Sequence, residues 1–287
     1  MADAKIILRD TSTPSAASAA DVARKLSVFE LLWNDGFVRK SLIIVVLAAI
    51  WQAYGSYLDN PLLFPTFSDT IAALWEKVRD GTIPMRAWTS LKVLFMGYAA
   101  GIALAAILTV LAISTRIGTD FLETVTAMFN PLPAIALLPL ALIWFGLGSG
   151  SLVFVLIHSV LWPLALNTYA GFQAVPETLR MAGRNYGLTG IRYVVQILIP
   201  AALPAILSGL KIGWAFAWRT LIAAELVFGA TSGKGGLGWY IFQNRNELYT
   251  DKVFAGLALV IVIGLLVESL VFSTLERVTV RRWGVQR

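Results

Sequence analysis

Three charged residues, Lys211, Arg219 and Glu225, interrupt the otherwise apolar run 208–229. If this run crosses a membrane, a charge at its centre costs about 2.5 to 3.5 kcal/mol on insertion scales, so each charge needs a reason. At a rise of about 1.5 Å per residue, Arg219 lies about 12 Å beyond Lys211 and about 9 Å before Glu225. Arg219 is therefore expected near the middle of the membrane, and the other two near its surfaces, where long side chains reach water.

A guanidinium group at this depth could attract an anion that crosses the membrane beside it. The alternative is a structural ion pair, with Glu225 or with Glu268 of the last apolar run as the carboxylate. Both explanations keep Arg219 away from lipid, and the sequence leaves both open.

Asn130 and His158 are two further polar side chains that could line a path. His158, the only histidine, lies midway along the apolar run 150–171 and is either a hydrogen-bonding group in a cavity or a packing residue. Asn130 directly precedes Pro131 and allows the same two interpretations. One histidine and no cysteine make a bis-histidine haem, a zinc centre or an iron–sulfur cluster hard to build.

Two glycine-rich stretches resemble nucleotide-binding loops only in part. GKGGLG (233–238) fits G-x-G-x-x-G, but no strand precedes it and no acidic residue follows at the required spacing. GATSGK (229–234) has three residues between its glycines, where a phosphate-binding loop has four, and Gly follows its lysine. We predict that the chain is not an enzyme and has no cofactor of its own, so that any ATPase is a separate polypeptide.

The composition is that of a membrane protein. Of 287 residues, 57% are hydrophobic and 14% are charged, whereas soluble domains carry about 25% charged residues. Crossing a hydrocarbon core takes about 18 or more apolar residues. On this criterion we predict an all-α integral membrane protein with six transmembrane helices, at 41–58, 88–113, about 122–145, 150–171, about 208–229 and 253–275.

Lys and Arg are concentrated before the first span, between the fourth and fifth spans, and after the last span. This distribution predicts that both termini face the cytoplasm. Residues 1–40 are expected to form a cytoplasmic tail, in which 22–40 is either a helix along the inner membrane face or a linker. The transmembrane domain then covers 41–276, and 277–287 is a basic cytoplasmic tail. The net charge of +6 is explained by this topology, without a nucleic-acid partner.

The third span is interrupted by Pro131, Pro133 and Pro139. Each proline removes a backbone donor and clashes with the preceding helical turn. Irregular backbone at membrane depth is tolerated only where protein buries it or water in a cavity hydrates it. The span is expected to line a path, and a kinked helix with a purely structural role is the alternative.

A polar stretch, ETLRMAGRNYG (177–187), lies between two apolar regions. Pro176 suits the start of a helix, and Gly187 and Gly190 suit its end. We therefore predict a short cytoplasmic helix with a turn at about 176–190. Because so short a helix is marginal in water, it should dock on a partner.

The apolar segment 193–207 follows this helix and contains Pro200 and Pro204. It is too short and too interrupted to cross the membrane by itself. We expect it to enter the membrane edge and to lead into the fifth span.

These residues resemble the EAA loop of bacterial ABC importer permeases. In that family Glu-Ala-Ala is followed after three residues by Gly, and after nine more by Ile-x-Leu-Pro. Here Met181-Ala182-Gly183 is followed at the same spacing by Gly187 and by Ile197-Leu198-Ile199-Pro200, with Met181 replacing the family's Glu and Ile199 its Leu. NPLPAIALLPLALIWFGLG, GLKIGWAFAWRTLIAAEL and GKGGLGWYI resemble the nitrate, taurine and aliphatic sulfonate branch, so the resemblance covers about residues 50–283.

The resemblance implies a type I ABC importer permease fold in the bacterial inner membrane, with a cytoplasmic coupling helix at about 176–190. It also implies a second permease copy, most simply in a homodimer, an extracytoplasmic solute-binding protein, and two ATPase subunits that bind ATP and Mg. The residues that it assigns to ATPase coupling are Met181, Ala182, Gly183, Gly187 and Pro200.

We thus expect an importer of a small anion, such as a sulfonate, nitrate or an organic acid, whose path through the lipid membrane includes Asn130, His158, Arg219 and Glu225. The main alternative is a secondary transporter driven by an ion gradient. It would need repeated halves and coupling carboxylates, and the sequence shows no repeat and only Glu225 and Glu268 as candidates. A scaffold or receptor that transports nothing would leave the broken span and Arg219 unexplained.

Overall fold

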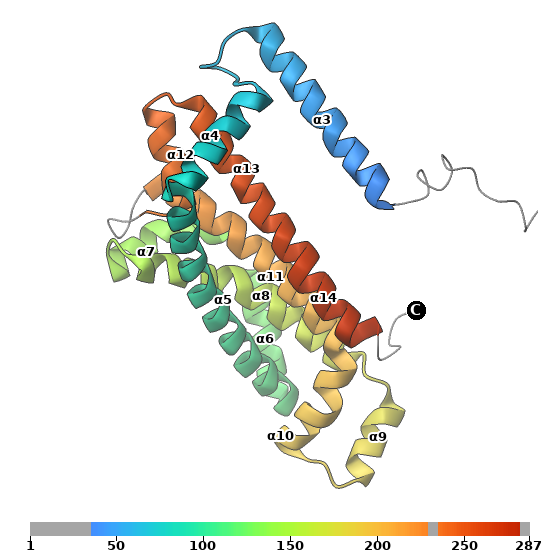
Figure 1. The fold of residues 1–287 in the computed structure, drawn as a ribbon. Helices are drawn as coiled ribbons and strands as arrows, with labels where there is room; N and C mark the ends of the chain where they lie inside the picture. Colours follow the sequence, from blue (N-terminus) through green and yellow to red (C-terminus); the bar gives the residue numbers. More distant parts are fainter. Residues whose placement is uncertain (1–35, 229–234, 282–287) are drawn as a thin grey trace, which may run out of the picture. The chain divides into compact units, whose positions relative to one another are not determined.

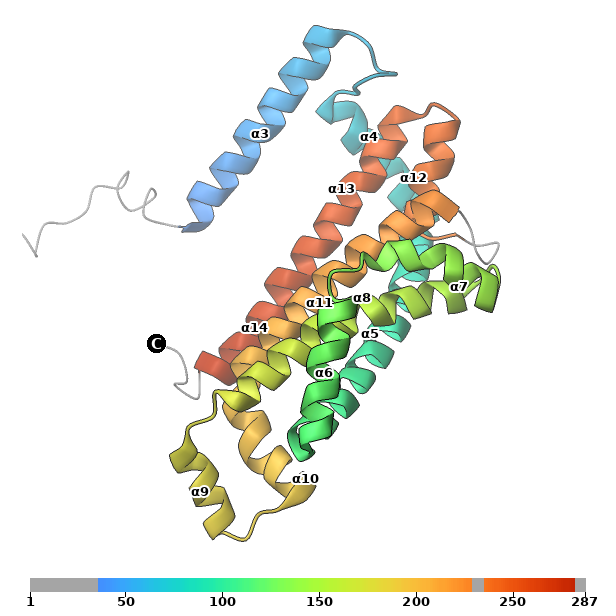
Figure 2. The ribbon, with the colours of Figure 1, turned by 180° about the vertical axis from the view of Figure 1, so that it is seen from behind.

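The computed structural model describes residues 36–228 and 235–281, and within these ranges every regular element is a helix (Figures 1 and 2). Contacts within the chain divide it after Tyr54. The first described helix, α3 (Gly36–Leu58), contains this boundary and is therefore considered by itself. Most of the predicted N-terminal tail, with residues 22–35 of the expected interfacial helix, lies outside the described residues, and residues 36–40 begin α3.

Short connections join the helices that follow. Their bounds are α4 (Phe67–Arg79), α5 (Thr82–Ser114), α6 (Arg116–Phe129), η1 (Ala134–Leu137), α7 (Leu138–Phe145), α8 (Ser149–Gln173), α9 (Glu177–Asn185), α10 (Gly190–Tyr193), η2 (Val194–Leu198), α11 (Ile199–Phe228), α12 (Leu237–Asn246), α13 (Thr250–Leu266), η3 (Val267–Phe272), α14 (Ser273–Glu276) and η4 (Arg277–Arg281). The last helix thus continues into the predicted C-terminal tail, of which 282–287 lie outside the described residues.

The predicted membrane architecture is confirmed. In the described part of the chain, five helical segments are long and apolar enough to cross a membrane, and a bent pair makes a sixth if it counts as one span. These five segments are Gly36–Leu58, Thr82–Ser114, Ser149–Gln173, Gly190–Val227 and Thr250–Thr279. The bent pair is α6 with η1 and α7, at the position predicted for the third span.

The third span is broken where its prolines predicted a break. α6 ends at Phe129, and the segment that begins at Ala134 is turned by 87° from it. Pro131 and Pro133 lie in the connection between the two, where no helical hydrogen bond is lost. Pro139 lies in the first turn of α7, a position that proline favours because its missing N–H would have no intrahelical partner.

Two expectations about the fifth span need correction. Gly190 begins α10 and does not end the preceding helix, and α10, η2 and α11 run on as one helical segment through Pro200 and Pro204. The wider π-helical turns of η2 end at Leu198, two residues before Pro200. A proline ring clashes with the carbonyl four residues earlier, and a widened turn at that place relieves the clash.

The core forms where α8 packs against α5 and α11. Buried side chains at these contacts include Leu94 of α5, Leu156 and Val160 of α8, and Leu221 of α11. Gly101 of α5 lies against Val160, so close that a Cβ built on the glycine would be 2.7 Å from the Cβ of Val160. Small residues let membrane helices approach in this way and gain van der Waals contact.

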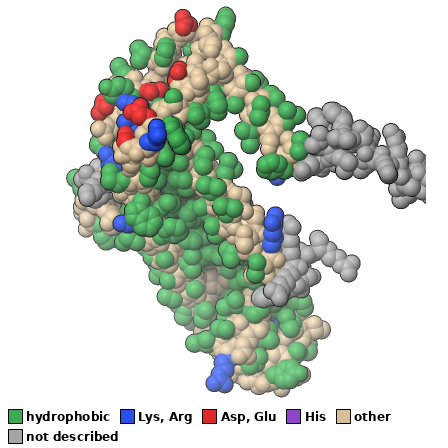
Figure 3. Space-filling view, viewed as in Figure 1, with side chains coloured by type: hydrophobic (Ala, Val, Ile, Leu, Met, Phe, Trp, Pro, Cys, Tyr) green, Lys and Arg blue, Asp and Glu red, His purple; other side chains and the backbone are tan. Residues whose placement is uncertain are grey.

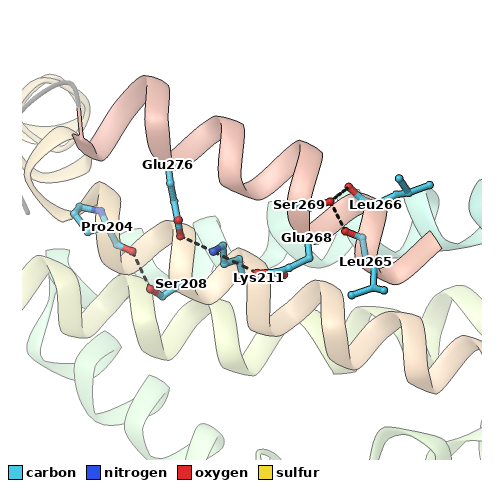
Figure 4. Close-up of polar contacts among 8 residues, drawn as sticks. All are labelled: Pro204, Ser208, Lys211, Leu265, Leu266, Glu268, Ser269 and Glu276. Atoms are coloured by element: carbon cyan, nitrogen blue, oxygen red, sulfur yellow. Dashed lines mark hydrogen bonds and ion pairs between the residues drawn. The ribbon is translucent and has the colours of Figure 1, made fainter. Parts of the chain in front are cut away.

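An ion pair of three side chains ties the last span to the fifth (Figure 4). Lys211 Nζ of α11 lies 3.4 Å from Glu268 Oε1 of η3 and 2.5 Å from Glu276 Oε1 of α14. The lysine is largely covered, and its two partners lie about two turns apart on one helical segment. Opposite charges held this close make a charged residue tolerable beside an apolar layer.

The face shown in Figure 3 has the distribution of side chains expected at a membrane. Apolar side chains cover its middle, and Asp, Glu, Lys and Arg gather at the end that carries α4 and α12. At this end Lys77 contacts Glu76 and Asp80, at 2.9 and 2.8 Å. The charges thus lie where water is available to them.

Replacing Gly101 by Ala should lower the melting temperature of the purified permease. The new Cβ would force α5 and α8 apart, and overpacking of this kind costs about 1 to 3 kcal/mol. Gly150→Ala in α8 is the matched control, because its Cβ would meet Phe145 at an ordinary 3.7 Å. Thermal unfolding of both variants in one detergent, followed by circular dichroism, makes the comparison, and equal melting temperatures would contradict the close crossing.

Candidate functional site

The predicted short helix is α9, and Arg180 attaches it to the end of α8. The guanidinium group donates to the carbonyl oxygen of Phe172 from Nη2 at 2.5 Å and to that of Val175 from Nε at 3.1 Å. The last carbonyls of a helix lack intrahelical partners and favour a cation, so Arg180 satisfies them. Nothing in the sequence pointed to Arg180, because no local spacing rule connects it with the end of the preceding span.

The turn after α9 has the hydrogen bonds of a Schellman motif. Gly187 has a φ of 71°. Its N–H donates to the carbonyl of Arg184 at 2.9 Å, and the N–H of Leu188 donates to that of Gly183 at 3.1 Å. Glycine adopts a positive φ without steric cost, which explains its place here. The predicted turn at Gly187 is thus present, and Pro176 caps the start of α9 as expected.

Gly183 lets α9 lie close to the start of the fifth span. A Cβ at this position would be 2.9 Å from Cγ1 of Ile197 and 3.2 Å from the ring of Tyr193. On other sides of the helix, Met181 is 52% exposed, and Tyr186, just after its end, is 85% exposed. Apolar side chains are therefore available to a partner there.

Of the five residues predicted for coupling, four lie together and one lies on another helix. Met181, Ala182, Gly183 and Gly187 share α9 and its turn, whereas Pro200 lies in the first turn of α11. Gly183 connects the two regions, because it packs on Ile197, three residues before Pro200.

A cavity of about 320 Å³ lies where the broken span meets α8 and α11. It brings together three residues that the sequence analysis selected, Asn130, His158 and Arg219. Its other lining residues are Pro131, Leu132, Pro133, Ala134, Ile135, Ser159, Trp162, Pro163, Phe216 and Thr220. The irregular backbone of the third span therefore borders a cavity, the setting in which such backbone is tolerated at membrane depth.

Arg219 brings a positive charge to this cavity. Its Nε donates to the carbonyl of Ala215 at 2.9 Å, and its guanidinium carbon lies 5.1 Å from the centre of the Phe216 ring. Neither carboxylate considered as its partner forms an ion pair with it: Glu268 is paired with Lys211, and Glu225 is hydrogen-bonded to Ser90. Among the residues that the structure describes, Arg219 forms no ion pair.

His158 packs against aromatic rings and also lines the cavity. Its ring packs edge-on against Phe129 and Trp162, with ring centres 6.3 and 5.9 Å apart. Its Nε2 and the Nε1 of Trp162 are both buried without a hydrogen-bond partner in the described part of the protein. Both residues line the cavity, and buried polar atoms are normally satisfied by water or a ligand when protein does not satisfy them.

Glu225 lies outside the cavity lining, in a buried network near the end of α11. Ser90 Oγ of α5 lies 2.9 Å from both of its carboxylate oxygens, and the N–H of Gly238 donates to Oε2 at 2.8 Å. The N–H of Leu237 in turn donates to Ser90 Oγ at 2.8 Å. A carboxylate is favourable at the N-terminus of a helix, here α12, so Glu225 joins α12 to α5 and α11.

The described residues contain no group of three or more His, Asp or Glu side chains that could hold a metal ion. The groups that line the cavity, among them Arg219, Asn130 and Ser159, can bind a solute by hydrogen bonds and charge.

Comparison with known proteins places the chain in a family. Residues 97–283 match the family described as "Binding-protein-dependent transport system inner membrane component". The taurine transport system permease protein TauC of Escherichia coli is 30% identical, over 79% of this chain and 82% of TauC. The putative aliphatic sulfonates transport permease protein SsuC of the same species is 29% identical, over 78% and 84% of the two chains.

The nitrate import permease protein NrtB of Synechocystis sp. is 28% identical, over 86% of this chain and 91% of NrtB. The alignments thus extend through most of each relative, and the family match alone covers more than half of this chain. An ion-gradient-driven transporter is not favoured by these relationships. The chain belongs to the family of binding-protein-dependent transport system inner membrane components and is a multi-pass permease subunit of an ABC importer, in which partner subunits hydrolyse the ATP.

Proposed function

We propose that this permease imports a small oxyanion and that the cavity around Arg219 is a binding site on its translocation path. The observation that carries the proposal is a guanidinium group that lines a cavity of about 320 Å³ without a carboxylate partner in the described residues. NrtB, SsuC and TauC are named for nitrate, aliphatic sulfonates and taurine. These solutes share an anionic group with several equivalent oxygens, and we infer the same class for this chain.

The chemistry of the lining fits such a group. A guanidinium presents parallel N–H donors that match the geometry of an oxyanion. The hydroxyl groups of Ser159 and Thr220, which lie 3.2 Å apart, can turn toward a ligand, and the Nε1 of Trp162 is a donor without a partner among the described residues. The cavity is at the small end of the range of ligand sites, roughly 300 to 1,000 Å³. Asn130 and His158 complete its polar lining.

The proposed coupling runs from α9 to this cavity through one helical segment. α9 is attached to α8 by Arg180 and packs on Ile197 through Gly183. Ile197 and Arg219 belong to the same continuous segment, and at about 1.5 Å per residue they lie about 33 Å apart. A displacement of α9 by the ATPase is thereby passed to the helix that carries Arg219. Glu225 acts at the far end of this helix, where it holds α12 in place.

The partners and the topology follow from this assignment. We infer a homodimer of permeases and two ATPase subunits that bind ATP and Mg and dock on α9. A solute-binding protein docks at the opposite membrane face. α9 and both termini are then cytoplasmic, residues 1–40 and 277–287 form the tails, and 41–276 form the permease domain. The greater number of Lys and Arg on that side supports this orientation.

Arg219→Gln should lower kcat/KM for uptake of the transported anion by about tenfold or more, equivalent to about 1.4 kcal/mol. The substitution removes the charge and keeps a polar amide, and Arg219→Lys, which keeps a charge on a long side chain, should restore part of the activity. The measurement is uptake of a labelled anion into proteoliposomes that contain the whole complex, after co-purification has shown normal assembly. Arg245→Gln on α12 is the control. Normal kinetics in Arg219→Gln would exclude Arg219 from the path.

Gly187→Val should weaken the attachment of the ATPase. The position has open space around it, so the effect comes from the positive φ, which a β-branched residue adopts only with strain. Gly148→Val is the control, because Gly148 also lies in open space but has an extended φ of 176°. Retention of the ATPase on tagged permease should fall several-fold for Gly187→Val alone. If the two variants retain it equally, the turn does not contribute to docking.

A further inference from the structure

A second and larger cavity opens at the end of the bundle that carries α9. It has a volume of about 780 Å³ and is bounded by the end of α5, the start of α6, the end of α8, and by α9, α10 and η2. Figures 1 and 2 show α9 and α10 beyond the ends of α5 and α8. Since α5, α8 and the segment that begins with α10 are membrane spans, this cavity lies at the boundary between the apolar layer and water.

The outer part of this cavity is positively charged. Arg116, Arg180 and Arg184 line it, and no Asp or Glu of the described residues does so. Glu177 is the neighbouring carboxylate, at 3.9 Å from Arg180 and 3.8 Å from Arg184, and offsets one of the three charges. Arg180 is also engaged with the carbonyl oxygens at the end of α8. Arg116 and Arg184 are exposed and remain available to an anion.

The inner part of the cavity is apolar. Val110 and Ile113 precede the end of α5, and Phe172 precedes the end of α8, so all three lie toward the membrane. Val194 and Leu198 belong to the start of the fifth span. The hydroxyl group of Tyr193, between the two parts, is buried without a hydrogen-bond partner in the described residues. The lining therefore changes from basic to apolar along the direction that leads into the membrane.

We propose that this cavity binds an anionic phospholipid, with the phosphate at Arg116 and Arg184 and the first part of an acyl chain beside Val110, Val194 and Leu198. A free oxyanion would use the arginines only, whereas an amphiphile uses both parts of the lining. Membrane proteins hold lipid headgroups in basic pockets between spans in this way, and guanidinium–phosphate pairs are among the stronger hydrogen bonds. That the lipid comes from the cytoplasmic leaflet rests on the proposed topology.

A lipid in this position would connect α9 with the junction of α5 and α6. Arg184 belongs to α9 and Arg116 to the first turn of α6, and no hydrogen bond or ion pair recorded among the described residues joins the two. The bound phosphate would supply that connection, so that the position of α9 depends on the anionic lipid around the protein.

The test is lipid retention by the full-length permease in complex with its ATPase, purified from bilayers of phosphatidylcholine with added phosphatidylglycerol. Native mass spectrometry should find one phosphatidylglycerol retained per permease copy. Arg116→Gln, and Arg116→Gln combined with Arg184→Gln, should lose it. Arg192→Gln is the matched control, because Arg192 is an exposed arginine of α10 that does not line the cavity. Arg180 is left unchanged because it holds the end of α8.

Three outcomes would overturn the proposal. One is equal retention in the double variant and in Arg192→Gln. Another is equal retention of phosphatidylcholine and phosphatidylglycerol, which would mean that charge does not select the lipid. The third is displacement of the lipid by millimolar inorganic phosphate with phosphate bound in its place, which would identify a site for a free oxyanion. Arg219→Gln should retain the lipid normally, so failure of the proposed transport role and failure of the lipid site are distinguishable.

Discussion

The structure depends on one continuous helical segment, from Gly190 to Val227, that passes through the whole membrane layer. Its start packs on α9 through Ile197, and Lys211 near its midpoint pairs with the last span. Arg219 follows eight residues later, and the far end organises α12 through Glu225. A helix transmits axial and rotational displacement because each backbone group is bonded to the next turn. Pro200 and Pro204 would be expected to interrupt it, and the wider turns of η2 relieve the clash of Pro200 with the preceding turn.

α8 is the helix against which this segment packs. It is the most completely buried span among the described helices, it lies against α5 at the Gly101 crossing, and its end receives Arg180 from α9. The two cavities lie on it at different depths, one beside His158 at mid-membrane and one beside Phe172 at its end. Movement of α9 relative to α8 would therefore alter the wall of the larger cavity, which Arg180 and Arg184 of α9 line.

The polar groups inside the membrane fall into two classes. Lys211 and Glu225 are satisfied by partners within the chain, and their effect is to fasten helices to one another. Arg219 lacks an ion pair, and Nε2 of His158 and Nε1 of Trp162 lack hydrogen bonds, among the residues that the structure describes. In a low-dielectric layer a satisfied polar group specifies a fold, whereas an unsatisfied one beside a cavity favours a ligand. The proposed path therefore passes Arg219, which lacks an ion pair among the described residues, and not Glu225, whose carboxylate is hydrogen-bonded within the protein.

The sequence by itself determined the features that depend on neighbouring residues. Long apolar runs predicted the spans, Pro131 and Pro133 predicted the break in the third, and Gly187 predicted the turn after α9, since each follows from local backbone geometry. Only the tertiary structure decided that Glu225 meets Ser90, 135 residues away in the chain, that Lys211 pairs with Glu268 and Glu276, and that Arg180 closes the end of α8. It also decided that Gly190 starts a helix and that the fifth span stays continuous through its prolines. These features depend on how packed helices are rotated and spaced relative to one another, which the pattern along a single chain segment does not contain.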